Sequence, residues 1–312
     1  MSPKRMTQKF NLQSIIPFLG LVFVIVLFAV LTNGRNLSLS NINRIILQSV
    51  LLIIGSVGAA FTIAHGSLNF SLGGVLGMSV AIGGLAGMIH PILTIPAILI
   101  AAVLGEVLVA SLHIALKIPA IIVSLAMMFI TKGILVGITQ TVSVGLSSSY
   151  IAWDTPALYF SVLLCVVVIG YVLFQFTKIG KYNKAIGANF TAAKTSGVPV
   201  NKYKILAFIV SGFTLGISAF LNFVRTGGVS ATTGSGYEIN VLIALVLGGI
   251  SITGGTSVKI RGAVIGCLIL TILENGLVMI GVQPAMMGLI KGIIFLASIA
   301  LSYDRRNGQV IT

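Results

Sequence analysis

The sequence carries very little charge for its length, and acidic residues are the rarest part of it. Of its 312 residues only 8% are charged, and five are Asp or Glu, whereas 57% are hydrophobic. Soluble domains carry charge on about one residue in four, so this chain has too few charged groups to cover a surface that faces water. This scarcity argues against a soluble enzyme or binding module and favours a lipid bilayer as the solvent.

Cysteine and nucleotide-binding motifs are equally sparse. The two cysteines, Cys165 and Cys267, each lie inside an apolar run and provide neither a disulfide framework nor metal-ligand spacing. The sequence contains no G-x-x-x-x-G-K-[ST] phosphate-binding loop. We therefore expect reduced thiols, no metal site, no cofactor and no catalytic residues.

Long apolar runs make up most of the chain. A helix that crosses the bilayer core needs about 20 apolar residues, and the run from Ile15 is longer than the apolar part of a signal peptide. We predict an all-α polytopic membrane protein, with residues 1–312 as one transmembrane domain of about ten helices. These lie at 15–32, 44–64, 70–89, 93–116, 118–139, 157–177, 205–224, 238–256, 262–281 and 285–302. Eight spans are the alternative, because 70–89 and 238–256 are rich in glycine and either could be re-entrant or broken.

The positive charges are unevenly distributed among the predicted loops. The net charge of +14 is typical of nucleic-acid binding in a soluble protein, but in a membrane protein it reflects the bias of Lys and Arg toward cytoplasmic loops. We therefore predict no nucleic-acid partner and place both termini in the cytoplasm. This orientation puts most cations inside, namely Lys4, Arg5, Lys9, Lys117, the lysines of 178–204, Lys259, Arg261, Arg305 and Arg306.

The loop at 178–204 reads KIGKYNKAIGANFTAAKTSGVPVNKYK and holds six lysines with no acidic residue. Asn189 is a good helix N-cap, and Gly197 suits the left-handed position after a helix. We predict a short helix between them. A helix this short is marginal in water unless it packs on something. Two interpretations stay open on this pattern, namely a docking helix for a cytoplasmic partner and a basic loop on anionic lipid.

Three stretches resemble a known family. The pattern Ala192-Ala193-x-x-x-Gly197 resembles the cytoplasmic "EAA" loop of ATP-binding-cassette (ABC) importer permeases, and its surroundings resemble the ribose-type sugar permeases. GSLNFSLGG at 66–74 and the segments 236–266 and 273–282 extend the likeness. It also reaches, more distantly, the branched-chain amino-acid permeases. Two positions depart from the family pattern, with Thr191 in place of the EAA glutamate and Asn69 in place of a usual aspartate.

The resemblance implies a division of labour. A permease subunit of the prokaryotic inner membrane would pair with a second permease copy or a sister permease, and would hydrolyse nothing itself. A cytoplasmic ABC ATPase would dock on the loop, and an extracytoplasmic solute-binding protein would deliver a sugar or sugar-like solute. The docking residues would be Asn189, Thr191, Ala192, Ala193 and Gly197. Alternatives are a permease for nucleosides or branched-chain amino acids, and an ion-coupled secondary transporter.

Glycine-interrupted apolar segments occur in both halves of the chain, at 66–74 and 227–257. Such interruptions point to the pathway of a transporter. Neutral hydroxyls and amides in these segments suit a polyhydroxylated solute, whereas the alternative is hydrogen bonding between helices. The candidate pathway residues are Ser67, Asn69, Ser71, Thr233, Tyr237, Glu238 and Asn240.

Two acidic residues lie deep in the predicted spans. Glu106 and Lys132 are nearly equidistant from the turn near Ile118, and Glu274 and Lys291 are equally spaced about the turn at 282–283. An unpaired charge at mid-membrane costs about 2.5–3.5 kcal/mol on insertion scales. We therefore predict two structural ion pairs, Glu106–Lys132 and Glu274–Lys291. A proton or substrate relay is the functional alternative.

Overall fold

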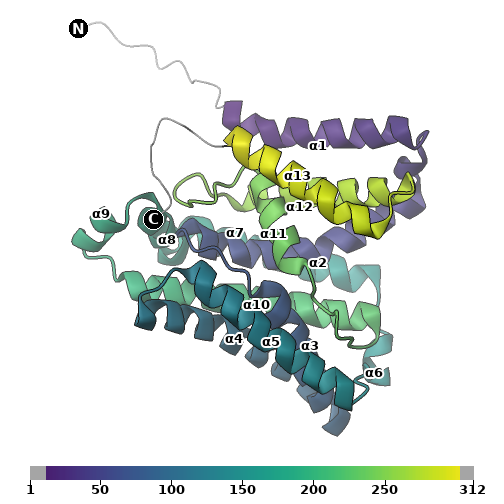
Figure 1. Ribbon diagram of the computed structural model, residues 1–312, viewed down its shortest axis with the longest axis horizontal. Coiled ribbons are helices and arrows are strands. Elements are labelled where there is room, and N and C mark those ends of the chain that lie inside the picture. Colours follow the sequence, from purple (N-terminus) through teal and green to yellow (C-terminus); the bar gives the residue numbers. More distant parts are fainter. Residues whose placement is uncertain (1–11, 303–312) are drawn as a thin grey trace, which may run out of the picture.

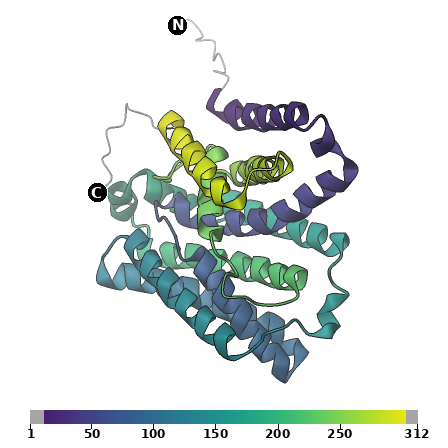
Figure 2. The same cartoon turned by 45° about the vertical axis from the view of Figure 1, so that its right-hand side comes forward.

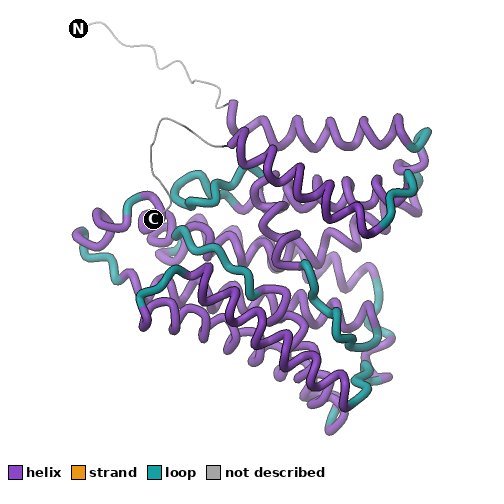
Figure 3. Tube along the Cα trace, viewed as in Figure 1, coloured by secondary structure: helices purple, strands orange, loops and turns teal. Residues whose placement is uncertain are grey.

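The structure is a computed structural model, and it describes residues 12–302. Figures 1 and 3 show helices joined by loops, with no strand in that range. The long helices are α1 (Leu12–Leu31), α2 (Leu39–Ala64), α3 (Leu72–Ile89), α4 (Thr94–Leu116), α5 (Ala120–Thr141), α7 (Pro156–Phe176), α10 (Val200–Thr226), α12 (Ile260–Met279) and α13 (Pro284–Ser302). The shorter ones are η1 (Arg35–Leu37), η2 (Pro91–Leu93), α6 (Ser148–Ile151), α8 (Lys178–Ala188), α9 (Phe190–Thr195) and α11 (Tyr237–Leu247).

Seven helical segments within 12–302 are long and apolar enough to cross a membrane, and three shorter apolar helices accompany them. The all-α, polytopic prediction is therefore confirmed, and each predicted apolar run coincides with a helix. One boundary was wrong, because the run 238–256 is helical only to Leu247. Beyond it, Gly248 packs its backbone against Gly262 of α12, and Gly249 adopts φ +76°, which only glycine accepts readily.

Two non-helical segments, hereafter the breaks, interrupt the path of the chain through the bundle. The chain leaves α2 and runs without helix through 67–71 before α3 begins, and it leaves α10 and runs through 227–236 before α11 begins. The second segment ends at a depth halfway along α2. Its position is shown by Tyr237 at the start of α11, whose hydroxyl donates a hydrogen bond to the carbonyl of Leu51, midway along α2. With 11 residues, α11 is about 16 Å long, half of the ~30 Å hydrocarbon core.

The helices of the two halves pack in an inverted pattern. Helix α4 packs on α10 and α12 packs on α2, while α3 lies against α4 and α5 as α11 lies against α12 and α13. Helices α2 and α10 run antiparallel, since Leu47 contacts Arg225 and Leu51 contacts Ser218. Inverted repeats with discontinuous helices characterise many transporters.

Close helix packing depends on small residues at the crossing points. A side chain at Gly58 of α2 would collide with Thr214 of α10, and one at Gly212 of α10 would collide with the backbone of α4 at Val103. Small residues at helix crossings let backbones approach in a membrane, where apolar burial adds little between helices. Glycines therefore allow close packing between helices of the two halves, in addition to their positions at the non-helical segments.

Helices α8 and α9 stand at one end of the bundle, at the left of Figure 1, and α6 lies at the opposite end (Figures 1 and 2). The short helix predicted between Asn189 and Gly197 is present as α9. The preceding part of the loop is also helical. A single residue, Thr177, separates the end of α7 from the start of α8 and is the N-cap of α8.

Candidate translocation site and docking helix

The start of α3 carries a closed polar network. Asn69 donates from Nδ2 to Glu106 Oε2 at 2.6 Å, and the Asn69 Oδ1 accepts from the Ser71 backbone N–H at 3.0 Å. The Ser71 hydroxyl lies 2.7 Å from Asn69 Oδ1 and 3.1 Å from Glu106 Oε1. All three residues are buried. The carboxylate of Glu106 is therefore held by neutral donors at the non-helical break.

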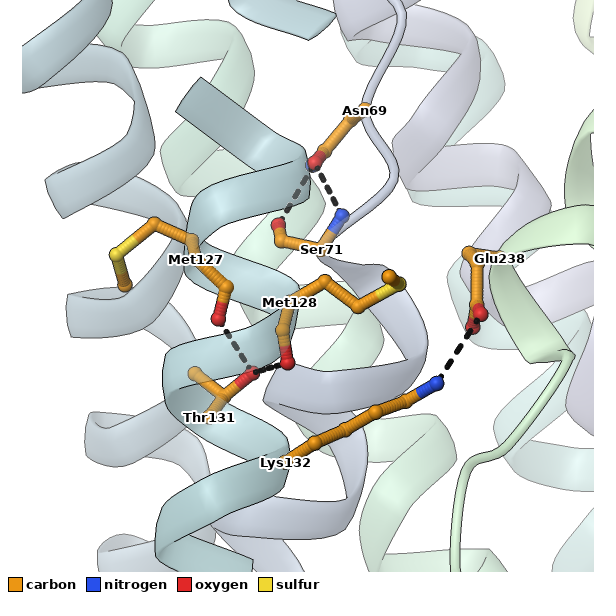
Figure 4. A network of polar contacts seen from close by, with 7 residues as sticks. All are labelled: Asn69, Ser71, Met127, Met128, Thr131, Lys132 and Glu238. Atoms are coloured by element: carbon orange, nitrogen blue, oxygen red, sulfur yellow. Dashed lines mark hydrogen bonds and ion pairs between the residues drawn. The ribbon is translucent and has the colours of Figure 1, made fainter. Parts of the chain in front are cut away.

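The start of α11 carries the second carboxylate. Glu238 lies in the first turn of α11, and its Oε1 is 3.6 Å from Lys132 Nζ of α5, whereas its Oε2 has no hydrogen-bond partner (Figure 4). Gly73, in the first turn of α3, has no room for a Cβ beside the Glu238 carboxylate. The N-termini of α3 and α11 thus meet at Glu238, where the positive ends of both helix dipoles favour a negative charge.

The predicted Glu106–Lys132 pair is wrong. Lys132 pairs with Glu238 instead, and Glu106 is bound by Asn69 and Ser71. The hairpin spacing placed Glu106 and Lys132 at similar depth, but α3 packs against both α4 and α5. The side chain of Lys132 extends past α3 to reach α11 in the other half of the chain, as Figure 4 shows.

The other predicted pair is found. Lys291 Nζ of α13 lies 2.9 Å from Glu274 Oε1 of α12 and 2.9 Å from Asn240 Oδ1 of α11. Lysines from α5 and α13 therefore both reach the short helix α11. Their contacts are two residues apart, at Glu238 and Asn240.

The remaining candidate pathway residues also cluster at the breaks. The Tyr237 hydroxyl donates to the Leu51 carbonyl at 2.9 Å and lies 3.1 Å from the Ser218 hydroxyl. Thr233 accepts from the Ser230 backbone N–H at 2.9 Å within the 227–236 segment, and its carbonyl faces Gly77 of α3. Ser67 is buried, and its N–H donates to Thr62 of α2 at 3.1 Å. Much of the polar chemistry at the breaks holds the helices together.

Sequence reasoning missed several polar residues that fix the breaks. Ser124 of α5 accepts from the Phe70 backbone N–H at 3.1 Å, and Ser218 of α10 donates to the Leu51 carbonyl at 2.9 Å. A usable signal was present in α10, where Ser211, Thr214 and Ser218 follow helical spacing along one face. A stripe of small hydroxyl residues in an apolar helix indicates close contact with another helix.

Several charged side chains within the transmembrane helices are partly exposed. Helices α5, α11 and α13 all lie toward the viewer in Figure 1. The side chains of Lys132 on α5 and Lys291 on α13 are 32% and 20% exposed, and that of Glu274, which pairs with Lys291, is 26% exposed. Intramembrane charges face a bundle interior or a water-filled cavity rather than lipid. The face formed by α5, α11 and α13, hereafter the charged face, therefore suits water or another protein surface.

Helix α9 is capped by Asn189 and packs one side on α8 and α10. The Asn189 side chain accepts from the Ala192 N–H at 2.9 Å, and Gly197 takes φ +79°. Thr191 and Ala192 are exposed. Ala193 is buried against Ile186, Val200 and Tyr203, so it seats the helix on the protein and offers no outer surface.

A chain of contacts connects α9 to the transmembrane helices. Lys204 Nζ of α10 lies 5.7 Å from the centre of the Phe190 ring and 3.0 Å from His113 Nε2 of α4. The other ring nitrogen of His113 lies 2.5 Å from the Ile118 carbonyl, in the turn to α5. A displacement of α9 would therefore act directly on α10 and on the α4–α5 hairpin.

Broken helices related by an inverted repeat, with charged groups at their meeting point and a small helix at one end, define a membrane transport protein. Residues 41–299 match the sequence model of the family described as the branched-chain amino acid transport system / permease component, and the chain belongs to this family. It is a multi-pass permease of the inner membrane.

Curated relatives align over most of this chain. It is 30% identical over 310 residues to the ribose import permease protein RbsC of Bacillus subtilis (strain 168), covering 95% of this chain and 94% of the relative. RbsC of Escherichia coli (strain K12) is 27% identical, with 92% and 94% covered. The xylose transport system permease protein XylH of Haemophilus influenzae is 26% identical, with 93% and 96% covered. No solved structure matches this chain.

Proposed function

We propose that this chain is the membrane-spanning permease subunit of an ABC importer for a sugar or a sugar-like solute. The observation that carries the proposal is the full-length similarity to ribose and xylose permeases. The meeting of the N-termini of α3 and α11 at Glu238 agrees with it, because transporters bind solutes where helices are discontinuous. The charge distribution supports ten spans, with α11 covering half a membrane and both termini inside.

The charged face is our candidate for the contact with a second permease copy, with the translocation pathway between the two. Lys132, Lys291 and Glu274, which pairs with Lys291, are partly exposed at mid-membrane, and lipid would not solvate them. A pathway shared by two copies would keep them in water. The solute would then meet Ile239 and the neighbouring Asn240 on α11, where Ile239 is 49% exposed.

ATP would be bound and hydrolysed by a separate ATPase subunit that docks on α9. The chain itself has no phosphate-binding loop. The exposed residues Thr191 and Ala192 would form the docking surface, with Asn189, Ala193 and Gly197 fixing its shape. An extracytoplasmic binding protein would deliver the solute at the opposite end of the bundle.

Co-purification with the ATPase tests this assignment. Ala192→Arg adds a bulky charge to the exposed side of α9, and Ala152→Arg adds the same group to an exposed alanine at the other end of the bundle. We expect Ala192→Arg to lose the ATPase and ATP-driven uptake, while Ala152→Arg keeps the ATPase. Retention of both by Ala192→Arg would refute docking on α9.

A permease for branched-chain amino acids is the second candidate, because the family description names that solute class. An amino acid carries a cation and a carboxylate, which the Lys132–Glu238 pair could match. Binding of ribose, xylose and leucine to the cognate binding protein separates the two candidates. Leucine binding without pentose binding would assign the second.

A further inference from the structure

A cavity of about 300 Å³ lies between the second turn of α1 and the N-terminal turns of α12. Its polar walls come from the loop before α12 and from the start of that helix. Its apolar walls come from α1, from α12 and from Ile250, near the beginning of the loop that joins α11 to α12. The lining residues include Phe18, Ile265, Thr256, Ser257, Lys259 and Arg261.

The loop that shapes this cavity is fixed by backbone contacts. The Gly255 N–H donates to the Ala64 carbonyl at the end of α2 at 2.9 Å, and Gly249 lies against the ring of Pro17. Both glycines have positive φ, at +86° and +76°, so the sequence specifies the bend of this loop. The bend that forms one wall of the cavity is thus part of the fold.

The lining residues suit a phosphate group attached to an apolar chain. Lys259 and Arg261 supply positive charge, and the Thr256 hydroxyl supplies a hydrogen-bond donor. The Ser257 hydroxyl donates to the Gly254 carbonyl at 3.4 Å, a long bond that it would exchange for a phosphate oxygen. The seam between α1 and α12 continues from the cavity along the membrane, where Val24 and Phe28 pack on Ile265 and Ile269. Phe18 and its neighbours Leu19 and Val22 are exposed on the outer side of α1.

The position of the cavity identifies the source of such a phosphate. It lies at the same end of the bundle as α8, and the pKa of Lys184 on α8 is lowered by burial and by the nearby cations Lys181 and Lys259. This end is cytoplasmic in the orientation of the proposed function, on which the inference rests. Basic pockets between transmembrane helices on the cytoplasmic side bind anionic lipid headgroups.

We propose that this cavity binds the phosphate headgroup of an anionic phospholipid of the inner leaflet. Lys259 and Arg261 contact the phosphate, Thr256 and Ser257 donate to its oxygens, and an acyl chain follows Phe18 along the α1–α12 seam. A free phosphate offers the same anionic oxygens but no chain, so the two sources differ in their use of the apolar wall.

Native mass spectrometry of the full chain with added phosphatidylglycerol tests the proposal. Each cation near an anionic membrane surface is worth roughly a factor of five in affinity. We expect Lys259→Gln/Arg261→Gln to weaken phosphatidylglycerol binding about 25-fold and to leave phosphatidylcholine binding unchanged. The charge-conserving pair Lys259→Arg/Arg261→Lys should retain phosphatidylglycerol. The control pair Lys178→Gln/Lys202→Gln, which removes two other exposed lysines, should also retain it.

The remaining outcomes decide between sources and partners. Displacement of phosphatidylglycerol by inorganic phosphate at equal concentration would overturn the lipid as source. Unchanged phosphatidylglycerol binding by Lys259→Gln/Arg261→Gln would overturn the site. If that variant instead lost the ATPase and still bound the lipid, the two cations would belong to a surface for the ATPase, and the lipid site would again be overturned. The measurement uses neither solute nor ATP, so a failure of the transport assignment leaves its result readable.

Discussion

The ion pair between Lys132 and Glu238 crosses from one half of the chain to the other, and its removal has a calculable cost. Lys132→Met keeps the length of the side chain and leaves the Glu238 carboxylate 5% exposed without its cation. Breaking a fully buried pair costs about 3–5 kcal/mol. Because the Lys132 side chain is 32% exposed, water screens part of the interaction, and we expect a loss of about 2 kcal/mol in the free energy of unfolding.

A double-mutant cycle isolates this pair from the packing of the methionine. Glu238→Gln alone should cost about 1 kcal/mol, because the lysine left behind has access to water. Lys132→Met/Glu238→Gln should cost less than the sum of the single changes by at least about 1 kcal/mol. Reversible unfolding in mixed micelles measures the four free energies, with Lys178→Met as a control in a lysine outside the bundle. Additive costs would refute the pairing of Lys132 with Glu238.

The other predictions concern the remaining parts of the site. Asn69→Asp places a second carboxylate against Glu106, which is 2.6 Å away, so it should destabilise the chain by about 1–3 kcal/mol, and Glu106→Gln should restore most of that loss in the same unfolding assay. Lys291→Met removes the cation shared by Glu274 and Asn240 and should cost about 1 kcal/mol, given that both charged side chains are partly exposed; a loss below the error of the assay would show that solvent replaces the pair. Asn189→Ala removes the N-cap bond to Ala192 and should destabilise α9 by about 1 kcal/mol, lowering ATPase affinity about fivefold in a pull-down titration. An unchanged affinity would mean that the ATPase does not require a preformed α9.

Much of the fold follows from short-range patterns in the sequence. The apolar runs determined the helices, and Asn189 and Gly197 determined α9, because a cap is a local property of a few residues. The Glu274–Lys291 pair was also accessible, since both residues belong to one hairpin. The partner of Lys132 could not be predicted from the sequence. Lys132 of α5 pairs with Glu238 of α11, which lies more than 100 residues later in the chain, and the apolar runs do not indicate which helices pack together.

Glycine patterns gave the location of the breaks but not their geometry. Segments 66–74 and 227–257 were singled out, yet the helix ends at Leu247 because Gly248 and Gly262 bring two backbones together. That contact joins residues 14 positions apart and becomes visible only in three dimensions. The sequence also did not show that Ala193 is buried against Val200 and Tyr203. An alanine at this position of a short helix has the same sequence pattern whether it contacts a partner protein or its own chain.

Thiol accessibility at Ile239 tests most directly the claim that the start of α11 lies in a solute pathway. In a chain whose Cys165 and Cys267 are replaced by serine, Ile239→Cys introduces a single thiol on the charged face, at a position 49% exposed. Leu164→Cys does so on α7, at a position 66% exposed, and serves as the lipid-facing control. We predict that a charged, membrane-impermeant thiol reagent labels Ile239→Cys in the reconstituted transporter, that solute slows this labelling, and that Leu164→Cys stays unlabelled. If Ile239→Cys is as inert as Leu164→Cys, the start of α11 faces lipid and the proposed pathway is wrong.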